Sequence, residues 1–121
     1  MTSPRLEVAV KQNDRVYVNR LLELYLGLPD TPSRTSRYDR QLAYKLHQQN
    51  VSLEIVEAAL LLGSARRIFR DPSYPPLGPI RSLHYFLPLI QEVIATHLPD
   101  DYLRYLRHKL ANHAAHTLTL R

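Results

Sequence analysis

The chain has no cysteine and only three glycines among its 121 residues. The absence of cysteine excludes disulfide bonds, thiolate zinc sites and a cysteine nucleophile. A glycine-rich loop that cradles phosphates is missing, and so are the H-E-x-x-H and G-x-S-x-G motifs of metalloproteases and serine hydrolases. We therefore expect a protein that is not an enzyme and that uses no metal or other cofactor.

Long apolar runs are also missing. The longest strongly apolar run covers residues 58–62, far below the roughly 20 residues that a membrane-spanning helix needs. The N-terminal residues lack the apolar core of a signal peptide. A chain of 121 residues is long enough to bury a core as a single domain. The sequence thus predicts one soluble, cytoplasmic domain over residues 1–121, with no membrane contact.

The charge is positive and unevenly distributed. The formal net charge is +5, yet residues 1–30 balance, so the whole excess follows Asp30. Thirteen of the sixteen basic residues are arginine, whose planar guanidinium suits bidentate contact with phosphate. An anionic partner is therefore a reasonable hypothesis.

Residues 52–70 predict the central helix of an all-α fold. Their apolar side chains surround the helix, and only Glu54, Glu57 and Ser64 mark a strip that could face water. A helix that is apolar nearly all round needs neighbours nearly all round. We expect a compact bundle of about five helices around it, with Ser52 as its N-cap and close backbone packing at Gly63.

Capping residues and helix-breaking residues predict where the neighbouring helices begin and end. Helices are expected at about residues 13–26 and 37–49, the second capped by Ser36 and ended by a left-handed Asn50. The first has Val16, Leu21, Leu24 and Tyr25 within reach of one face, and the second has the apolar positions Tyr38, Leu42 and Leu46 beside Ala43. Residues 71–79, rich in proline, predict a loop, and Pro88 predicts a break near Tyr85 in the helix that follows. Pro99 begins the last helix.

The two ends alternate between apolar and other residues, which is the period of a β-strand. Residues 1–12 are expected to form an extended arm containing LEVAVK, and residues 117–121 a tail with the sequence TLTLR. These segments could pair with each other, pair with another chain, or stay disordered. Pairing with another chain would make the termini a site of protein binding or self-association.

The basic residues gather at helix ends and along the last helix. We select as candidate nucleic-acid-binding residues Arg34, Arg37, Arg40, Arg66, Arg67, Arg70, Arg81, Arg104, Arg107 and Lys109. Clustered cations bind the phosphate backbone without sequence preference, and Tyr102 and Tyr105 could stack on unpaired bases. The alternative is a solvated face whose arginines bind carbonyl groups and carboxylates of the chain itself.

Two more specific motifs are not favoured. The helices at 37–49 and 52–70 resemble a helix-turn-helix in order, but the second carries Glu54 and Glu57 where a recognition helix would meet DNA. A helical hairpin within the core is the better interpretation. His113 and His116 have the i, i+3 spacing of metal ligands, but no third ligand lies nearby in the sequence.

Three stretches carry a resemblance to known proteins: LYLGLPDTPSRTSRYDRQLA, VEAALLLGSARR and PLGPIRSLHYFLPLIQEV. Together they resemble small helical proteins that bacteria encode near mobile elements and replication functions. Their order is loosely similar to the helical C-terminal domain of DnaD-type replication-initiation proteins. The resemblance covers about residues 24–93 and implies a helical core and a role near DNA replication; it transfers no catalytic residue.

The sequence thus favours a non-enzymatic accessory protein that binds the phosphate backbone of DNA or RNA through arginine clusters. Its setting would be a replication or mobile-element assembly. The alternative function is a protein-interaction module, or a small subunit of a larger assembly, without direct nucleic-acid contact. Such a module would dock through its proline-rich loop, its termini or an apolar groove.

Overall fold

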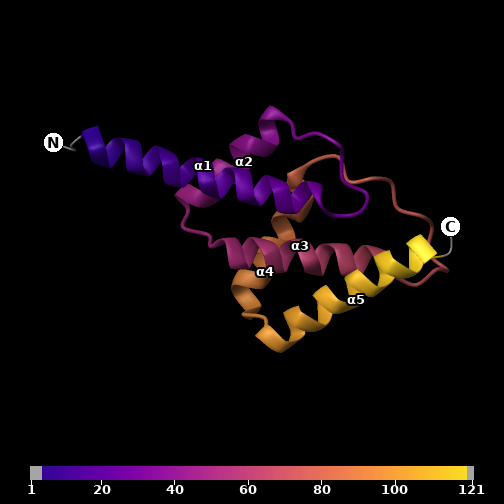
Figure 1. The fold of residues 1–121 in the computed structure, drawn as a ribbon. Helices are drawn as coiled ribbons and strands as arrows, with labels where there is room; N and C mark the ends of the chain where they lie inside the picture. The colour runs from indigo at the N-terminus through magenta and orange to yellow at the C-terminus, as the bar shows by residue number, and fades with distance from the viewer. Residues whose placement is uncertain (1–3, 120–121) are drawn as a thin grey trace.

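A computed structural model describes residues 4–119 of the chain, with side chains for residues 13–114. All regular structure between residues 4 and 119 is helical, which confirms the predicted all-α class. The elements are α1 (Pro4–Leu26), α2 (Arg37–Gln48), α3 (Leu53–Ile68), the short 3₁₀ helix η1 (Leu83–Phe86), α4 (Leu87–Thr96) and α5 (Asp100–Thr119) (Figure 1).

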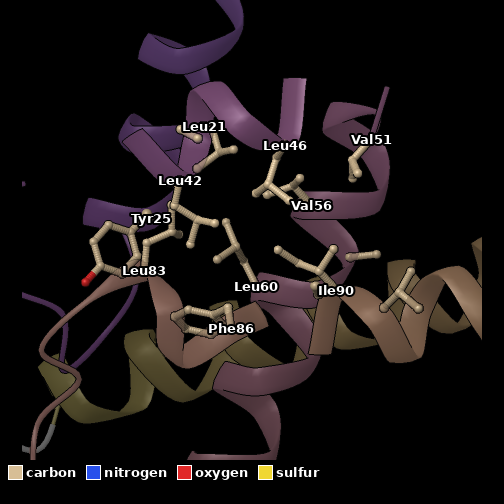
Figure 2. Close-up of a cluster of buried hydrophobic side chains, with 14 of the residues drawn as sticks. Leu21, Tyr25, Leu42, Leu46, Val51, Val56, Leu60, Leu83, Phe86 and Ile90 are labelled. Atoms are coloured by element: carbon tan, nitrogen blue, oxygen red, sulfur yellow. The ribbon is translucent and has the colours of Figure 1, made fainter. Parts of the chain in front are cut away.

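Helix α3 lies at the centre of the bundle, as predicted. It packs against α1, η1, α4 and α5, so neighbours surround its apolar side chains (Figure 1). Leu60 is 1% exposed and lies among side chains from α2, η1 and α4 (Figure 2). The close packing predicted at Gly63 is confirmed, because a Cβ placed there would lie 2.7 Å from the ring of Phe86.

The predicted solvent strip of α3 is only partly correct. Glu54 is exposed and Glu57 is half-buried, but Ser64 is buried, with 1% of its surface exposed. From Ala58 to Ala65 every position of α3 except Leu61 is buried, so the strip ends after Glu57. A serine is small enough to be enclosed there with the apolar residues.

Local capping signals define the start of α2 and the turn that leads to α3. Ser36 and Asp39 form a capping box, in which each side chain accepts a hydrogen bond from the other residue's backbone amide. Asn50 has a positive φ of 60°, as its left-handed role requires. Ser52 Oγ then accepts the Ile55 amide at the first turn of α3. These predictions are confirmed.

The predicted extended arm and terminal strands are wrong. Residues 4–12 continue α1 toward its N-terminus, and residues 117–119 belong to α5; residues 1–3, 120 and 121 lie outside the described residues. Between residues 4 and 119 there is no strand to which such a segment could pair. A helix satisfies its backbone hydrogen bonds within the segment, whereas a single strand leaves them open. An alternation of only six residues is too short to favour a strand over a helix against this difference in backbone hydrogen bonding.

The apolar faces predicted for α1 and α2 are confirmed in part. The structure buries the expected Leu21 and Tyr25 of α1 and the expected apolar positions of α2, but Val16 is 67% exposed and Tyr38 is 61% exposed. Helix α1 also buries Tyr17, Val18 and Leu22, which complete a stripe at 3.6-residue spacing. Helix α2 buries Leu42, Ala43 and Leu46 together with the carboxylate of Asp39, which turns Tyr38 outward.

The proline-rich loop and the break at Pro88 are as predicted. Residues 71–79 are exposed and contain no helix. The chain then forms η1 and changes to the α-helical geometry of α4 at Leu87, so that Pro88 lies in the first turn, where its missing amide costs nothing. The Ile80 amide donates to the Asp30 carbonyl over 2.8 Å and so joins the end of the loop to the α1–α2 linker.

Candidate nucleic-acid interface

An open hollow of about 450 Å³ lies between helices α1 and α2, and we call it the α1–α2 groove. Its lining residues are Asp14, Arg15, Val18, Arg37, Arg40, Gln41 and Tyr44. The α2 residues recur every three or four positions, so the helix presents them on a single face. The buried stripes of the two helices hold them together beneath this face.

The groove carries three guanidinium groups and one carboxylate. Arg15 and Arg37 form no ion pair with a described residue, and the guanidinium of Arg37 lies over the ring of Tyr38 at 5.6 Å. Arg40 donates only to the amide oxygen of Asn19, over 3.4 Å. The positive charge of the groove is therefore largely uncompensated.

The single carboxylate of the groove, Asp14, is held by a histidine. Asp14 Oδ1 lies 2.6 Å from Nδ1 of His47, and the His47 ring stacks on Tyr17 with centroids 4.4 Å apart. The Tyr17 hydroxyl in turn donates to the carbonyl of Val51 over 2.6 Å. This chain of contacts directs the carboxylate toward His47 at one side of the groove.

The N-terminus of α2, which follows Arg34, is not an open anion site. A helix N-terminus binds an anion through its free backbone amides. The capping box uses the amides of Ser36 and Asp39 as well as the Ser36 hydroxyl. Arg37 and Arg40 line the α1–α2 groove, whereas Arg34 is exposed in the preceding linker and does not line it.

Two other selected arginines bind carboxylates from distant parts of the chain. Arg66 donates to both carboxylate oxygens of Glu92 over 2.7 and 2.5 Å, and this bonding raises the pKa of Arg66 and lowers the pKa of Glu92. Arg107 donates twice to Glu57 Oε1, over 2.7 and 3.1 Å. An external phosphate would have to replace these carboxylates.

Arg67 and Arg70 hold the proline-rich loop. The Arg67 side chain is only 8% exposed; it donates to the Gly78 carbonyl over 2.6 Å and lies 3.6 Å from the Asp30 carboxylate. Arg70 donates to the Pro75 carbonyl over 3.1 Å, with its guanidinium over the Tyr74 ring. These contacts are those of the alternative interpretation, in which arginines bind groups of the chain itself.

The remaining selected cations lie outside the groove, and one of them shares another hollow with Arg107. Arg104 and Arg107 line an open hollow of about 700 Å³ on α5 with Asp101, Tyr105 and His108. Arg104 pairs with Asp101 one turn earlier in α5, and Lys109 lies over the rings of Phe69 and Tyr105. Arg81 is exposed and makes no contact with a described charged group. The structure therefore brings Arg37 and Arg40 together and leaves the other selected residues outside the groove.

Arg15, Gln41 and Tyr44 are groove residues that were not selected from the sequence. Arg15 lies within residues 1–30, whose charges cancel when they are summed. The cancellation does not hold locally, because the groove brings Arg15 together with Arg37 and Arg40 against the single carboxylate of Asp14. The 37, 41, 44 spacing along the second predicted helix was the available signal for Gln41 and Tyr44.

Comparison with known proteins adds no further constraint on this site. No family model, curated protein or solved structure matches the chain.

The part of the chain that the structure describes contains no cluster of three or more histidine, cysteine or acidic residues able to hold a metal ion. None of its helices combines the length and the apolar character needed to cross a bilayer.

Proposed function

We propose that this protein is a non-enzymatic accessory protein that binds the phosphate backbone of nucleic acid in the α1–α2 groove. The observation that carries the proposal is the convergence of Arg15, Arg37 and Arg40 on one hollow in which the only lining carboxylate is bound by His47. Following the resemblance of residues 24–93, we place this role in a cytoplasmic replication or mobile-element assembly.

Guanidinium groups suit this task for physical reasons. Each presents donors in a rigid plane that matches two phosphate oxygens, and it remains charged at any physiological pH. Binding also releases counterions from the nucleic acid, a gain that depends on charge and not on base sequence. The proposal therefore predicts weak sequence preference and strong salt dependence.

The other selected cations should contribute to phosphate binding to different degrees. Arg34 and Arg81 are exposed and form no ion pair with a described residue, so they are available to extend the contact beyond the groove. Arg66, Arg104 and Arg107 already have carboxylate partners. Exchanging one anion for another gains little, so we assign these three a minor part.

A second function, protein binding, is favoured by a cleft between α3 and α5. This hollow of about 380 Å³ is lined by Leu62, Ala65, Arg66, Phe69, Tyr102, Tyr105, Leu106 and Lys109. Its apolar floor and exposed tyrosines suit a side chain of a protein partner. The α1–α2 groove is the stronger site for an anion because its arginines have no carboxylate partner among the described side chains.

The test is a salt series of binding measurements on DNA and RNA with two matched variants. One variant changes Arg15, Arg37 and Arg40 to alanine; the control changes Arg20, Arg66 and Arg104, which pair with carboxylates outside the groove, and so removes the same charge. The groove variant should lose affinity by well over tenfold, because it removes three arginines and about tenfold is the scale of one lost charge-assisted hydrogen bond. Its log–log salt slope on duplex DNA should decrease by about 2.7, at roughly 0.9 per phosphate contact.

The control should change the slope less than the groove variant does. Equal losses in the two variants would mean that net charge and not the groove governs binding. Failure of the unchanged protein to bind any nucleic acid at low salt would refute the proposal and would favour the protein-binding function.

A further inference from the structure

The α1–α2 groove contains groups that phosphate binding does not require. Tyr44 lines the groove with 44% of its surface exposed. Among the described side chains, no aromatic ring or cation contacts the Tyr44 ring, unlike that of Tyr38, which Arg37 covers on one face. Gln41, one turn earlier on α2, adds an amide that can both donate and accept hydrogen bonds.

These groups distinguish a single strand from a duplex. In a duplex the base faces are stacked inside the double helix, so a surface tyrosine has no base face to contact. Proteins read duplex base edges with elements that protrude into the DNA grooves, whereas Gln41 lies in a hollow of the protein. An unpaired base offers both a face for stacking and a free edge for hydrogen bonds.

The dimensions of the groove fit the same interpretation. A volume of about 450 Å³ falls within the range of sites that enclose a small molecule. Such a hollow admits one nucleotide with its base turned toward the protein. The guanidinium groups of Arg15, Arg37 and Arg40 share the groove with the tyrosine ring, so phosphate and base can be bound together.

A second, smaller hollow lies on the neighbouring face of α2. It measures about 320 Å³ and is lined by Tyr38, Gln41, Leu42, Lys45, His84 and Leu87. Gln41 borders both hollows, and the second again combines an exposed tyrosine with a lysine. A strand that leaves the α1–α2 groove can therefore meet another ring and another cation next to it.

We propose that the ligand of the α1–α2 groove is single-stranded nucleic acid. One base stacks on Tyr44, its edge binds Gln41, and its phosphates bind Arg15, Arg37 and Arg40. The strand then crosses α2 toward Tyr38 and Lys45. This inference rests on the proposed function, and it adds the ligand class and the residues that recognise it.

The test compares an oligothymidine strand with a hairpin duplex, using the full-length protein. Tyr44→Leu should weaken binding of the single strand by about tenfold, the scale of one lost base–aromatic stack. Its salt slope should remain unchanged because no charge is removed. Tyr44→Phe should retain the affinity, and Tyr74→Leu, at an exposed tyrosine of the proline-rich loop, should also retain it. Gln41→Ala provides a second, independent variant that should weaken single-strand binding.

The outcomes separate this inference from the proposed function. Preference for the duplex, with Tyr44→Leu and Gln41→Ala at full affinity, would overturn the single-strand inference while the arginine variants could still support backbone binding. Competition by a free nucleotide at the same concentration as the strand would show a mononucleotide pocket and would also overturn it. Absence of binding to every nucleic acid would overturn both.

Discussion

At the scale of single residues, the surroundings of each arginine decide what it can do. Arg67 and Arg15 have the same side chain, but Arg67 is enclosed and donates to a loop carbonyl, whereas Arg15 is exposed beside a hollow. A guanidinium with an internal acceptor stabilises the fold, and one without is available to a ligand. The number of arginines in a sequence therefore overestimates the cations available for binding.

Gly63 provides a direct test of core packing. A Cβ at this position would lie 2.7 and 2.9 Å from two carbons of the Phe86 ring, which is itself fully buried. Gly63→Ala gains up to about 1 kcal/mol in helix propensity but overpacks the core at a cost of roughly 1–3 kcal/mol. We expect a lower melting temperature. In the control, Gly78→Ala, the added methyl meets nothing within 4 Å and should leave the melting temperature unchanged or slightly raised.

Two buried tyrosines predict a loss of stability at alkaline pH. Burial raises the pKa of Tyr17 and of Tyr25 from 10.0 to about 12, and the charge of Asp39 contributes at Tyr25. The folded state holds these protons more tightly than the unfolded chain does. Stability should therefore be complete below pH 10 and decrease as the pH rises toward 12. Denaturant unfolding across this range would measure the loss.

Phenylalanine variants at these two positions should behave differently. The Tyr25 hydroxyl has no protein partner among the described residues, so Tyr25→Phe should retain or increase stability at neutral pH and reduce the alkaline loss. The Tyr17 hydroxyl donates to the Val51 carbonyl, so Tyr17→Phe should cost about 1 kcal/mol. Equal alkaline sensitivity of Tyr25→Phe and the unchanged protein would contradict the assignment to Tyr25.

At the scale of secondary-structure elements, Asp39 connects α2 to the second half of the chain. One carboxylate oxygen accepts the Ser36 amide and the other accepts the Leu83 amide over 2.9 Å. A buried carboxylate is tolerated here because both oxygens have donors. The same side chain therefore caps α2 and positions η1, which fixes the orientation of the helix that carries most of the groove residues.

Among the helices that pack against distant parts of the chain, α5 should be the least stable. Leu106 is its only fully buried hydrophobic residue within the described side chains, with Leu103 and Leu110 partly buried beside it. Leu106→Ala should cost about 2–5 kcal/mol of that packing. Native-state hydrogen exchange should then show faster exchange at α5 amides, with α3 amides still protected. Uniform acceleration across both helices would mean that α5 unfolds only together with the core.

At the scale of the whole molecule, the sequence predicted the features that depend on neighbouring residues. The caps at Ser36 and Ser52, the left-handed Asn50 and the break at Pro88 are all local patterns. The buried character of α3 also follows from a short stretch. The terminal segments were assigned wrongly because their alternation was too short to distinguish a strand from the helical turn that satisfies its own backbone.

The candidate site was less predictable because its electrostatics depend on distant residues. Arg66 binds a carboxylate 26 positions away, and Arg107 binds one 50 positions away. Helical periodicity does not show such pairs. The contribution of Arg15 was hidden for the same reason, since the two arginines that share its groove come from α2. Composition indicated an anionic ligand, and only the packing of α1 on α2 placed the cations that are available to bind it.

The exposed proline-rich loop makes this chain a natural candidate for splitting into two fragments. A specific protease site inserted after Leu77 would separate a fragment holding α1, α2 and α3 from one holding η1, α4 and α5. The fragments should still elute as one particle, because α4 and α5 pack on α3 and Asp39 binds the Leu83 amide across the cut. Only denaturant should part them, and two separately expressed halves should reassemble through the same surfaces.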